Sequence, residues 1–286
     1  MTTATPAHWS HPTATAVLRT ADGVNIHASV RGQGTIAIVV AHGFSGGHRS
    51  GAFNRILGWL ADRFLVVAID QRGHQHSGGE CTLGHFEVHD IDVAVEYARK
   101  LGAEKVFTLG FSMGAAGVIR HAALTKPEVT RPEFDRALQV RHAPDGVITI
   151  GGAARWYYRG TLRMWMLHFL VGTAVGRIFV RNKYKVRADL STWPAENHPR
   201  RAEIQPLDPR ACVSLLAPMP VLIVQGEHDN YFRRDHGDSL FEAAKVPGHQ
   251  AEYWFVPNMG HAEHATSREL IEQIKQWIDA HVGRAQ

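Results

Sequence analysis

Short runs of hydrophobic residues alternate along the chain with longer stretches in which hydrophobic residues recur at helical spacing. Six of these runs are continuous and rich in β-branched or aromatic residues, as the strands of a buried sheet are. They span residues 35–41, 64–69, 106–109, 147–150, 221–224 and 252–256. Ahead of them, residues 16–30 predict an antiparallel hairpin that turns at the Ala-Asp-Gly sequence of residues 21–23.

Two later stretches predict amphipathic helices, because their hydrophobic residues recur every three or four positions. The positions are Val88, Ile91, Val95 and Ala98 in the first helix, and Ile271, Ile274, Ile278 and Val282 in the second. Thr266 and Glu269 have the spacing of a capping box at the start of the second helix. Alternating strands and helices predict an α/β fold, with a mostly parallel, twisted sheet covered by helices on both faces.

One interval departs from this alternation. Between residues 151 and 217 no strand pattern occurs, and the interval is too long for a loop in a compact domain. We therefore predict a core formed by residues 1–150 and 218–286, and a helical lid or cap formed by residues 151–217.

A nucleophile candidate follows the strand at residues 106–109. The sequence Gly110-Phe111-Ser112-Met113-Gly114 has the G-x-S-x-G pattern of a nucleophile elbow, and a helical stretch comes next. A serine in so sharp a turn needs small residues two positions before and after it, which Gly110 and Gly114 supply. The alternative interpretation is an ordinary glycine-rich turn between a strand and a helix.

A serine hydroxyl needs a base to take its proton and a carboxylate to orient that base. Asp229 follows the strand at residues 221–224 and is the candidate acid, with Glu227 as its competitor. His261 follows the last strand and is the candidate base, with His264 as its competitor. Because ligands bind beyond the carboxyl ends of parallel strands, we expect these groups to meet Ser112.

Two backbone N–H groups should stabilise the negative oxygen that forms during acyl transfer. The N–H of Met113, directly after the nucleophile, is the first candidate. The second is the N–H of Phe44, in the glycine-rich loop of residues 42–47 that follows the first core strand. A glycine-rich turn that binds nothing is the alternative.

Composition and charge exclude several other classes of protein. The net charge of +4 over 286 residues is too small for a dedicated nucleic-acid-binding protein. Cys81 and Cys212 form neither a disulfide framework nor a zinc motif, which favours a reducing, cytoplasmic location. The N-terminus has no pattern of a secretory signal, and the apolar stretch from Met164 to Val180 is too short and too interrupted for a transmembrane helix.

Histidines crowd one short stretch, at His74, His76, His85 and His89. Their spacing is compatible with metal ligands, but no cysteine or ordered carboxylate pattern accompanies them. We expect no metal and no cofactor, because the proposed chemistry requires neither.

The motifs together resemble those of the α/β-hydrolase superfamily, above all its bacterial serine esterases and monoacylglycerol-lipase-like hydrolases. The matching pieces are H-G-F-S-G-G at 42–47, D-Q-R-G-H at 70–74, G-F-S-M-G at 110–114, G-E-H-D at 226–229 and N-M-G-H at 258–261. The resemblance implies Ser112, Asp229 and His261 as a catalytic triad, Phe44 and Met113 as oxyanion donors, and a lid. It also implies a structural role for Asp70 and Arg72.

One position departs from the pattern of these relatives. They usually have G-H-G-x-S where this chain has Gly-His-Gln-His-Ser at residues 73–77, so Gln75 replaces a glycine in a loop near the site entrance. A serine at this position argues against haloalkane dehalogenases and epoxide hydrolases, which use aspartate there.

The predicted lid is both basic and hydrophobic. From Arg155 to Arg201 it holds ten basic and two acidic residues. Its aromatic residues either line an apolar acyl pocket or pack the lid onto the core, and four of them are candidate substrate-binding residues: Trp156, Tyr157, Trp165 and Phe169. The basic run from Arg181 to Arg187 either contacts anionic lipid, as a peripheral membrane protein does, or is a solvated face.

We therefore expect a serine hydrolase that cleaves a small-molecule ester or thioester with an apolar acyl group. Carbon–carbon hydrolase, amidase or perhydrolase chemistry on the same triad is one alternative. A binding protein that keeps the fold without turnover is another.

Overall fold

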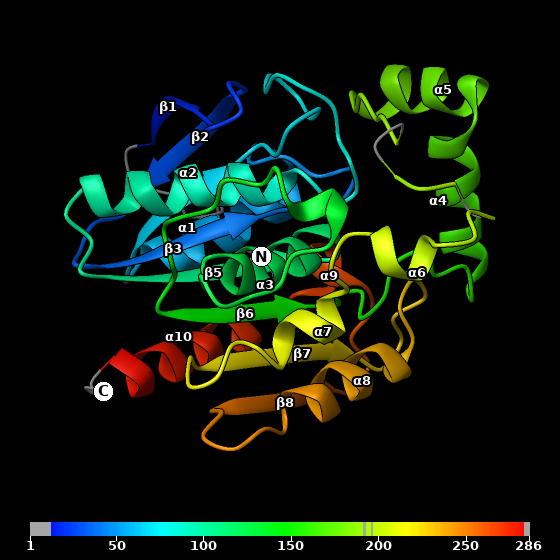
Figure 1. The fold of residues 1–286 in the computed structure, drawn as a ribbon. Helices are drawn as coiled ribbons and strands as arrows, with labels where there is room; N and C mark the ends of the chain where they lie inside the picture. The colour runs from blue at the N-terminus through cyan, green and yellow to red at the C-terminus, as the bar shows by residue number, and fades with distance from the viewer. Residues whose placement is uncertain (1–12, 191–192, 196, 283–286) are drawn as a thin grey trace, which may run out of the picture.

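The computed structural model describes residues 13–190, 193–195 and 197–282. The first twelve residues, for which the sequence predicts no secretory signal, lie outside the described residues. An eight-stranded sheet crosses the molecule, and helices cover both of its faces (Figure 1). The strands are β1 (Ala14–Arg19), β2 (Asn25–Arg31), β3 (Ile36–Ala41), β4 (Leu65–Ile69), β5 (Lys105–Phe111), β6 (Gly146–Ile150), β7 (Val221–Gly226) and β8 (Ala251–Val256).

The helices follow the strands in near-regular alternation. They are α1 (Gly51–Ala61), α2 (Glu87–Lys100), α3 (Met113–Leu124), η1 (a 3₁₀ turn, Glu133–Asp135), α4 (Leu162–Gly172), α5 (Ala174–Tyr184), α6 (Arg201–Ile204), α7 (Pro209–Val213), α8 (Arg234–Ala244), α9 (Ala262–Ala265) and α10 (Arg268–Val282).

The sheet is mostly parallel, as the sequence predicts. Its strand order is β1-β2-β4-β3-β5-β6-β7-β8. The hairpin of β1 and β2 is antiparallel, with Ala14 opposite Val30, and β2 is antiparallel to β4. From β4 to β8 all neighbours are parallel, so their carboxyl ends meet at one edge. The predicted α/β fold and all six predicted core strands are confirmed.

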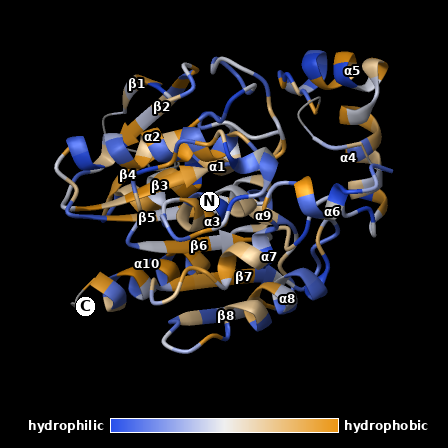
Figure 2. Ribbon diagram, viewed as in Figure 1, coloured by the Kyte–Doolittle hydropathy of each residue, from blue (hydrophilic) through white to orange (hydrophobic). Residues whose placement is uncertain are grey.

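The hydrophobic runs fill two core layers, one on each face of the sheet. Residues of α2, α3, α7 and α8 pack on one face, and residues of α1 and α10 pack on the other. Figure 2 shows hydrophobic residues concentrated in the strands between these helices. Alternate strand residues therefore face different layers, which explains why the runs are continuous instead of alternating with polar residues.

The interval between β6 and β7 is helical, as predicted. It holds α4, α5, α6 and α7, and α4 and α5 form a hairpin at one end of the molecule (Figure 1). The apolar stretch from Met164 to Val180 is divided between α4 and α5 at Thr173, whose hydroxyl accepts a hydrogen bond from the N–H of Gly176. Within the described residues, no helix has the length and apolarity to cross a membrane.

The end of this interval packs against the core. Cys212 and Val213 of α7 are buried in the same layer as residues of α3. The lid function of residues 151–217 stays a prediction, and so does their division from the core as a separate domain.

The predicted capping box at Thr266 is wrong by one residue. α10 begins at Arg268, and the hydroxyl of Ser267 accepts a hydrogen bond from the N–H of Leu270 at 3.2 Å. The hydroxyl of Thr266 instead donates to the carbonyl of Ala262 in the preceding helix. Thr266 and Ser267 both have a hydroxyl that could cap α10, so the sequence pattern is ambiguous. The hydroxyl of Thr266 bonds to α9 and is therefore not the cap of α10.

We expect Ser267→Ala to lower the free energy of unfolding by about 1 kcal/mol, the usual effect of losing a capping hydroxyl. Ser267→Asp keeps an acceptor at the helix start and should retain most of that stability. Urea unfolding of the three proteins measures the difference. Equal stabilities of the alanine variant and the unmodified chain would contradict the assignment.

Candidate active site

The carboxyl ends of the parallel strands carry the candidate residues. The loop after β3 holds Phe44, the turn after β5 holds Ser112, and the loop after β7 holds Asp229. His261 lies between β8 and α9. The parallel register places all four at the carboxyl ends of the strands, and α4 and α5 lie beyond these strand ends in Figure 1.

Ser112 lies in a strained turn between β5 and α3. Its φ of 51° is in the left-handed region, which residues other than glycine rarely adopt. A Cβ on Gly110 would lie 2.3 Å from the carbonyl oxygen of Gly114, and a Cβ on Gly114 would lie 2.4 Å from that of Ala41. The two glycines therefore let the backbone close tightly under the serine.

Three side chains form one continuous hydrogen-bonded chain. The hydroxyl of Ser112 lies 2.9 Å from Nε2 of His261, and Nδ1 of His261 lies 2.7 Å from Oδ2 of Asp229. The other carboxylate oxygen of Asp229 accepts the N–H groups of Tyr231 and Phe232 at 2.8 and 2.9 Å. Asp229 is thus buried, fixed by the backbone and aimed at the imidazole.

The two competitors lie elsewhere. The carboxylate of Glu227 is exposed and accepts the N–H of Asn258. His264 is exposed at the edge of the cavity that contains Ser112. The structure therefore brings Asp229 and His261, and neither competitor, into the chain of hydrogen bonds with Ser112.

The backbone N–H groups of Phe44 and Met113, the two predicted oxyanion donors, lie in the loop after β3 and at the start of α3. Met113 is the first residue of α3, so its N–H has no acceptor within the helix. The carbonyl of Gly43 accepts from Nδ1 of His42 at 2.7 Å and from the N–H of Gly46 at 2.9 Å. A trans peptide directs its N–H opposite to its carbonyl, so the N–H of Phe44 points away from these donors. Both residues line the cavity above Ser112.

His42 is a buried clamp for this loop. Its Nε2 accepts the backbone N–H of Gln71 at 3.0 Å, so the ring proton must lie on Nδ1, which donates to the carbonyl of Gly43. The Gln71 side chain in turn donates to the carbonyl of His42. Burial, together with the nearby His74, lowers the pKa of His42 to about 3, which keeps its ring neutral.

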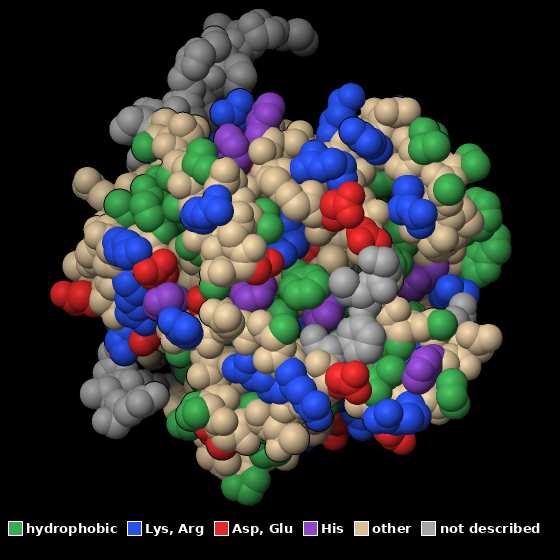
Figure 3. Space-filling view, turned by 45° about the horizontal axis from the view of Figure 1, so that its top comes forward, with side chains coloured by type: hydrophobic (Ala, Val, Ile, Leu, Met, Phe, Trp, Pro, Cys, Tyr) green, Lys and Arg blue, Asp and Glu red, His purple; other side chains and the backbone are tan. Residues whose placement is uncertain are grey.

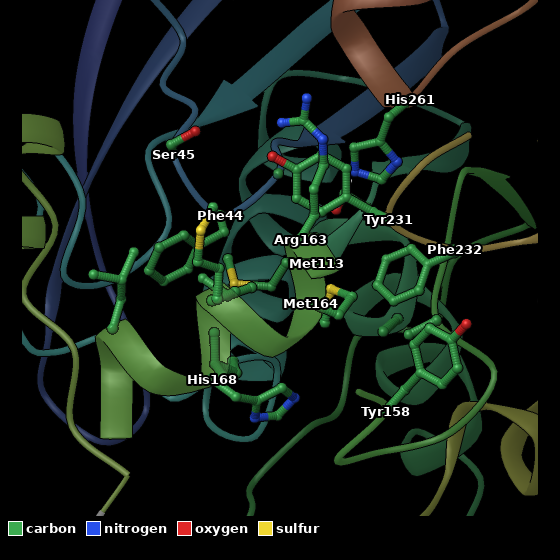
Figure 4. A pocket seen from close by; sticks show the side chains of 18 of the residues that line it. Phe44, Ser45, Met113, Tyr158, Arg163, Met164, His168, Tyr231, Phe232 and His261 are labelled. Atoms are coloured by element: carbon green, nitrogen blue, oxygen red, sulfur yellow. Dashed lines mark hydrogen bonds between the residues drawn. The ribbon is translucent and has the colours of Figure 1, made fainter. Parts of the chain in front are cut away.

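A cavity of about 580 Å³ opens above Ser112. Figure 4 shows Phe44 and Met113 on one side of it, and Tyr158 and Phe232 on another. Trp156 and Tyr157 line it as predicted. From α4 it receives Arg163, Met164, Met166, Leu167, His168 and Leu170.

Trp165 and Phe169 do not line the cavity, which corrects the sequence prediction. They are 52% and 54% exposed, and their rings stack on one another 5.9 Å apart. Met164 and Leu167 of the same helix face the cavity, and a helix cannot present positions 165 and 169 to that side as well. Composition alone did not show which face of α4 points inward.

Two residues near the triad were missed by the sequence analysis. Glu263 is only 6% exposed and lines the cavity, and a Cβ on Gly43 would lie 3.2 Å from both its Oε1 and the Cβ of Ser112. Tyr231 stacks on the ring of His261 with centroids 4.3 Å apart (Figure 4). The sequence offers one signal for each of them: Glu263 lies two positions after His261, and Tyr231 lies two positions after Asp229.

Asp70 and Arg72 have partners away from the cavity. Asp70 accepts the backbone N–H of His48 at 2.7 Å. Arg72 lies between Asp22 and Asp90, at 2.7 and 2.8 Å. Burial raises the pKa of Asp90 to about 7, although the guanidinium opposes this shift. Both residues tie segments below the site together.

Gln75, the departure from the family pattern, has a φ of 46°. This left-handed conformation favours glycine, which is the residue that relatives usually have there. Its side chain is exposed and contributes nothing to the cavity lining. The difference from the family pattern therefore affects the backbone conformation of the loop, and the Gln75 side chain is not part of the cavity wall.

The crowded histidines have separate partners. His74 is buried, and its Nε2 and Nδ1 lie against the carbonyl oxygens of Phe44 and Arg72, which helps to fix the loop at the cavity. His76 is exposed, whereas Nδ1 of His89 bonds the carbonyl of Gln139. Among the residues that the structure describes, no three His, Cys, Asp or Glu side chains are grouped to hold a metal ion.

The chain is similar to known proteins in sequence and in fold. The model of the alpha/beta hydrolase family matches residues 38–273. A 94-residue segment is 34% identical to the uncharacterized hydrolase YraK of Bacillus subtilis (strain 168); it covers 32% of this chain and about a third, 34%, of that protein's length.

Solved structures show the fold over nearly the whole chain. The esterase Pf2001 of Pyrococcus furiosus superposes with a TM-score of 0.66 at 16% identity, covering 99% of this chain and 94% of its own. The alpha/beta hydrolase GrgF of Penicillium sp. sh18 has a TM-score of 0.67 at 15% identity, with 94% and 99% covered.

We expect His42 to keep one tautomer, protonated on Nδ1, between pH 5 and about 8, because its pKa lies near 3. Long-range ¹H–¹⁵N spectra distinguish the two ring nitrogens, and loss of the signals in His42→Gln assigns them. A ring that titrates near pH 6.5, or one protonated on Nε2, would contradict the clamp.

Proposed function

Because the chain belongs to the alpha/beta hydrolase family, we propose that it is a serine hydrolase that cleaves a carboxylic ester or thioester with an apolar acyl group. The hydrogen-bonded chain from Ser112 through His261 to Asp229, lying beneath a cavity, is the observation that supports this proposal most strongly. The name of the similarly folded Pyrococcus furiosus protein, an esterase, agrees with it.

In the proposed reaction, Nε2 of His261 takes the proton of Ser112 as the serine oxygen attacks the acyl carbonyl. Asp229 holds the Nδ1 proton and stabilises the imidazolium that forms. The amides of Phe44 and Met113 donate to the oxyanion. His261 then gives its proton to the leaving alcohol or thiol, and later activates the water that releases the acid from Ser112.

An apolar acyl group is supported by the wall that α4 contributes. Met164, Leu167 and Leu170 face the cavity, and Trp156 and Tyr157 add aromatic surface. Removal of apolar surface from water then favours binding of a hydrocarbon chain. In this proposal α4 covers the site, so the segment of residues 151–217 acts as a lid over a small-molecule substrate.

The proposed location is the cytoplasm. Cys81 and Cys212 are both buried and unpaired, as thiols in a reducing compartment usually are. Burial raises the pKa of the Cys212 thiol to about 12, which leaves it unreactive. The proposed reaction uses neither thiol and requires no cofactor.

We expect Ser112→Ala to reduce hydrolysis of p-nitrophenyl butyrate by at least about 10³-fold, because it removes the hydroxyl that lies 2.9 Å from Nε2 of His261. Ser45→Ala is the matched control, since Ser45 lines the same cavity without belonging to the chain of hydrogen bonds. Circular dichroism checks that both variants fold. Unchanged turnover in Ser112→Ala, or an equal loss in Ser45→Ala, would refute the assignment.

We expect a strong preference for p-nitrophenyl butyrate over its anionic counterpart, the p-nitrophenyl monoester of succinate. The buried carboxylate of Glu263 beside Ser112 repels a second negative charge. Glu263→Gln keeps the shape and removes the charge, so the ratio of the two kcat/KM values should fall about ten-fold or more. An unchanged ratio would show that Glu263 does not act on the bound acyl group.

A further inference from the structure

The α4–α5 hairpin exposes two hydrophobic stripes, one on each helix. On α4 the exposed residues recur with helical spacing at Leu162, Trp165, Met166 and Phe169, and on α5 they are Val175, Ile178 and Phe179. Val175 is 79% exposed and Ile178 is 61% exposed. A surface helix normally directs such a stripe inward, and contiguous apolar surface on a monomer usually marks an interaction site.

The inner sides of the two helices are already occupied. Val171 and Val180 are fully buried, and a Cβ on Gly176 would lie 2.2 Å from the carbonyl oxygen of Leu170, so the helices pack closely against each other. Met164 and Leu167 face the cavity. Apart from Met166, which also lines the cavity, the residues of the outer stripes contribute neither to the packing between the two helices nor to the cavity lining.

Exposed basic side chains occur on the same two helices and in the segments next to them. Those exposed on or next to the hairpin are Arg159, Arg163, Arg177, Arg181, Lys183 and Lys185. The sequence has no Asp or Glu between residues 146 and 188. Figure 3 shows hydrophobic and basic side chains gathered together on the side of the molecule that α4 and α5 form, at the right of the view.

We propose that the outer face of the α4–α5 hairpin docks onto an anionic phospholipid surface. Trp165, Phe169 and Ile178 insert among the acyl chains near the headgroups, and the exposed Arg and Lys side chains pair with lipid phosphates. Helices with aromatic and aliphatic residues on one face and basic residues beside it bind membrane interfaces in this way. This inference goes beyond the proposed hydrolysis and does not depend on it.

Charge favours a lipid surface over a second copy of the chain. A symmetric dimer through this face would bring the same patch of both copies together, and therefore basic side chains against basic side chains. Residues 146–188, which include both helices, contain no Asp or Glu that would pair with these basic side chains across such an interface. An anionic surface supplies the missing negative charge in excess.

Docking would also place the cavity beside the lipid. Met166 of α4 is 48% exposed and belongs both to the outer stripe and to the cavity lining. Arg163 is exposed as well, and its guanidinium lies over the ring of Tyr231, next to His261 (Figure 4). The edge of the cavity and the docking face therefore share residues.

The test is co-sedimentation of the full chain with vesicles, made either of phosphatidylcholine or of equimolar phosphatidylcholine and phosphatidylglycerol. We expect binding to the anionic vesicles only, and its loss at about 0.5 M salt, where exposed charges are screened. The double variants Trp165→Ser/Phe169→Ser and Arg181→Glu/Lys183→Glu should each weaken partitioning at least about ten-fold. Val17→Ser removes an equally exposed hydrophobic residue from β1, far along the sheet, and should have no effect.

Thermal unfolding shows that each variant is folded, and analytical ultracentrifugation gives the oligomeric state without vesicles. Absence of binding to anionic vesicles would overturn the proposal. So would equal binding to both vesicle types, or a dimer that Trp165→Ser/Phe169→Ser dissociates, which would assign the face to a second copy. Failure here with Ser112-dependent hydrolysis intact would leave the proposed reaction standing.

Discussion

The close approach of three backbone segments under Ser112 is the constraint on which the site depends. The strand β5, the start of α3 and the end of β3 meet where Gly110 and Gly114 leave no room for a Cβ. This contact forces Ser112 into its left-handed conformation and lifts its hydroxyl above the sheet. The same contact makes Met113 the first residue of a helix, so one turn presents both the proposed nucleophile and an N–H that has no acceptor within the helix.

Backbone groups also hold the residues around this turn. Two N–H groups fix one oxygen of Asp229, and the backbone N–H of Gln71 fixes the tautomer of His42. Because these partners belong to the main chain, they do not depend on side chains with many rotamers. The fold thus pre-organises these groups, as the proposed stabilisation of an oxyanion would require.

Much of the fold could be predicted from the sequence, because continuous β-branched runs have few other ways to be buried. The places of Ser112, Asp229 and His261 followed from their positions after core strands, and the geometry joins them as expected. The orientation of α4 could not be predicted in this way, since it is hydrophobic on nearly every side. Trp165 and Phe169 were therefore placed in the cavity, whereas they face outward.

Other details failed for different reasons. Thr266 and Ser267 are both good capping residues, and only the three-dimensional course of α9 decides between them. Glu263 is marked in the sequence only by its place two residues after His261, because its approach to Ser112 depends on how segments distant in sequence come together. Sequence periodicity reports which elements form, but convergence of loops from separate strands is a tertiary property.

The strands β6 and β7 are neighbours in the sheet, with Val147 paired to Val221, yet α4 to α7 lie between them in the chain. The chain therefore leaves the sheet at the end of β6 and re-enters it in the neighbouring strand β7, and this adjacency does not depend on the length of the segment between them. Insertions, deletions and substitutions in the segment between β6 and β7 therefore need not shift the register of any strand. The cavity wall that this segment contributes can consequently change while the chain of hydrogen bonds from Ser112 through His261 to Asp229 stays in place.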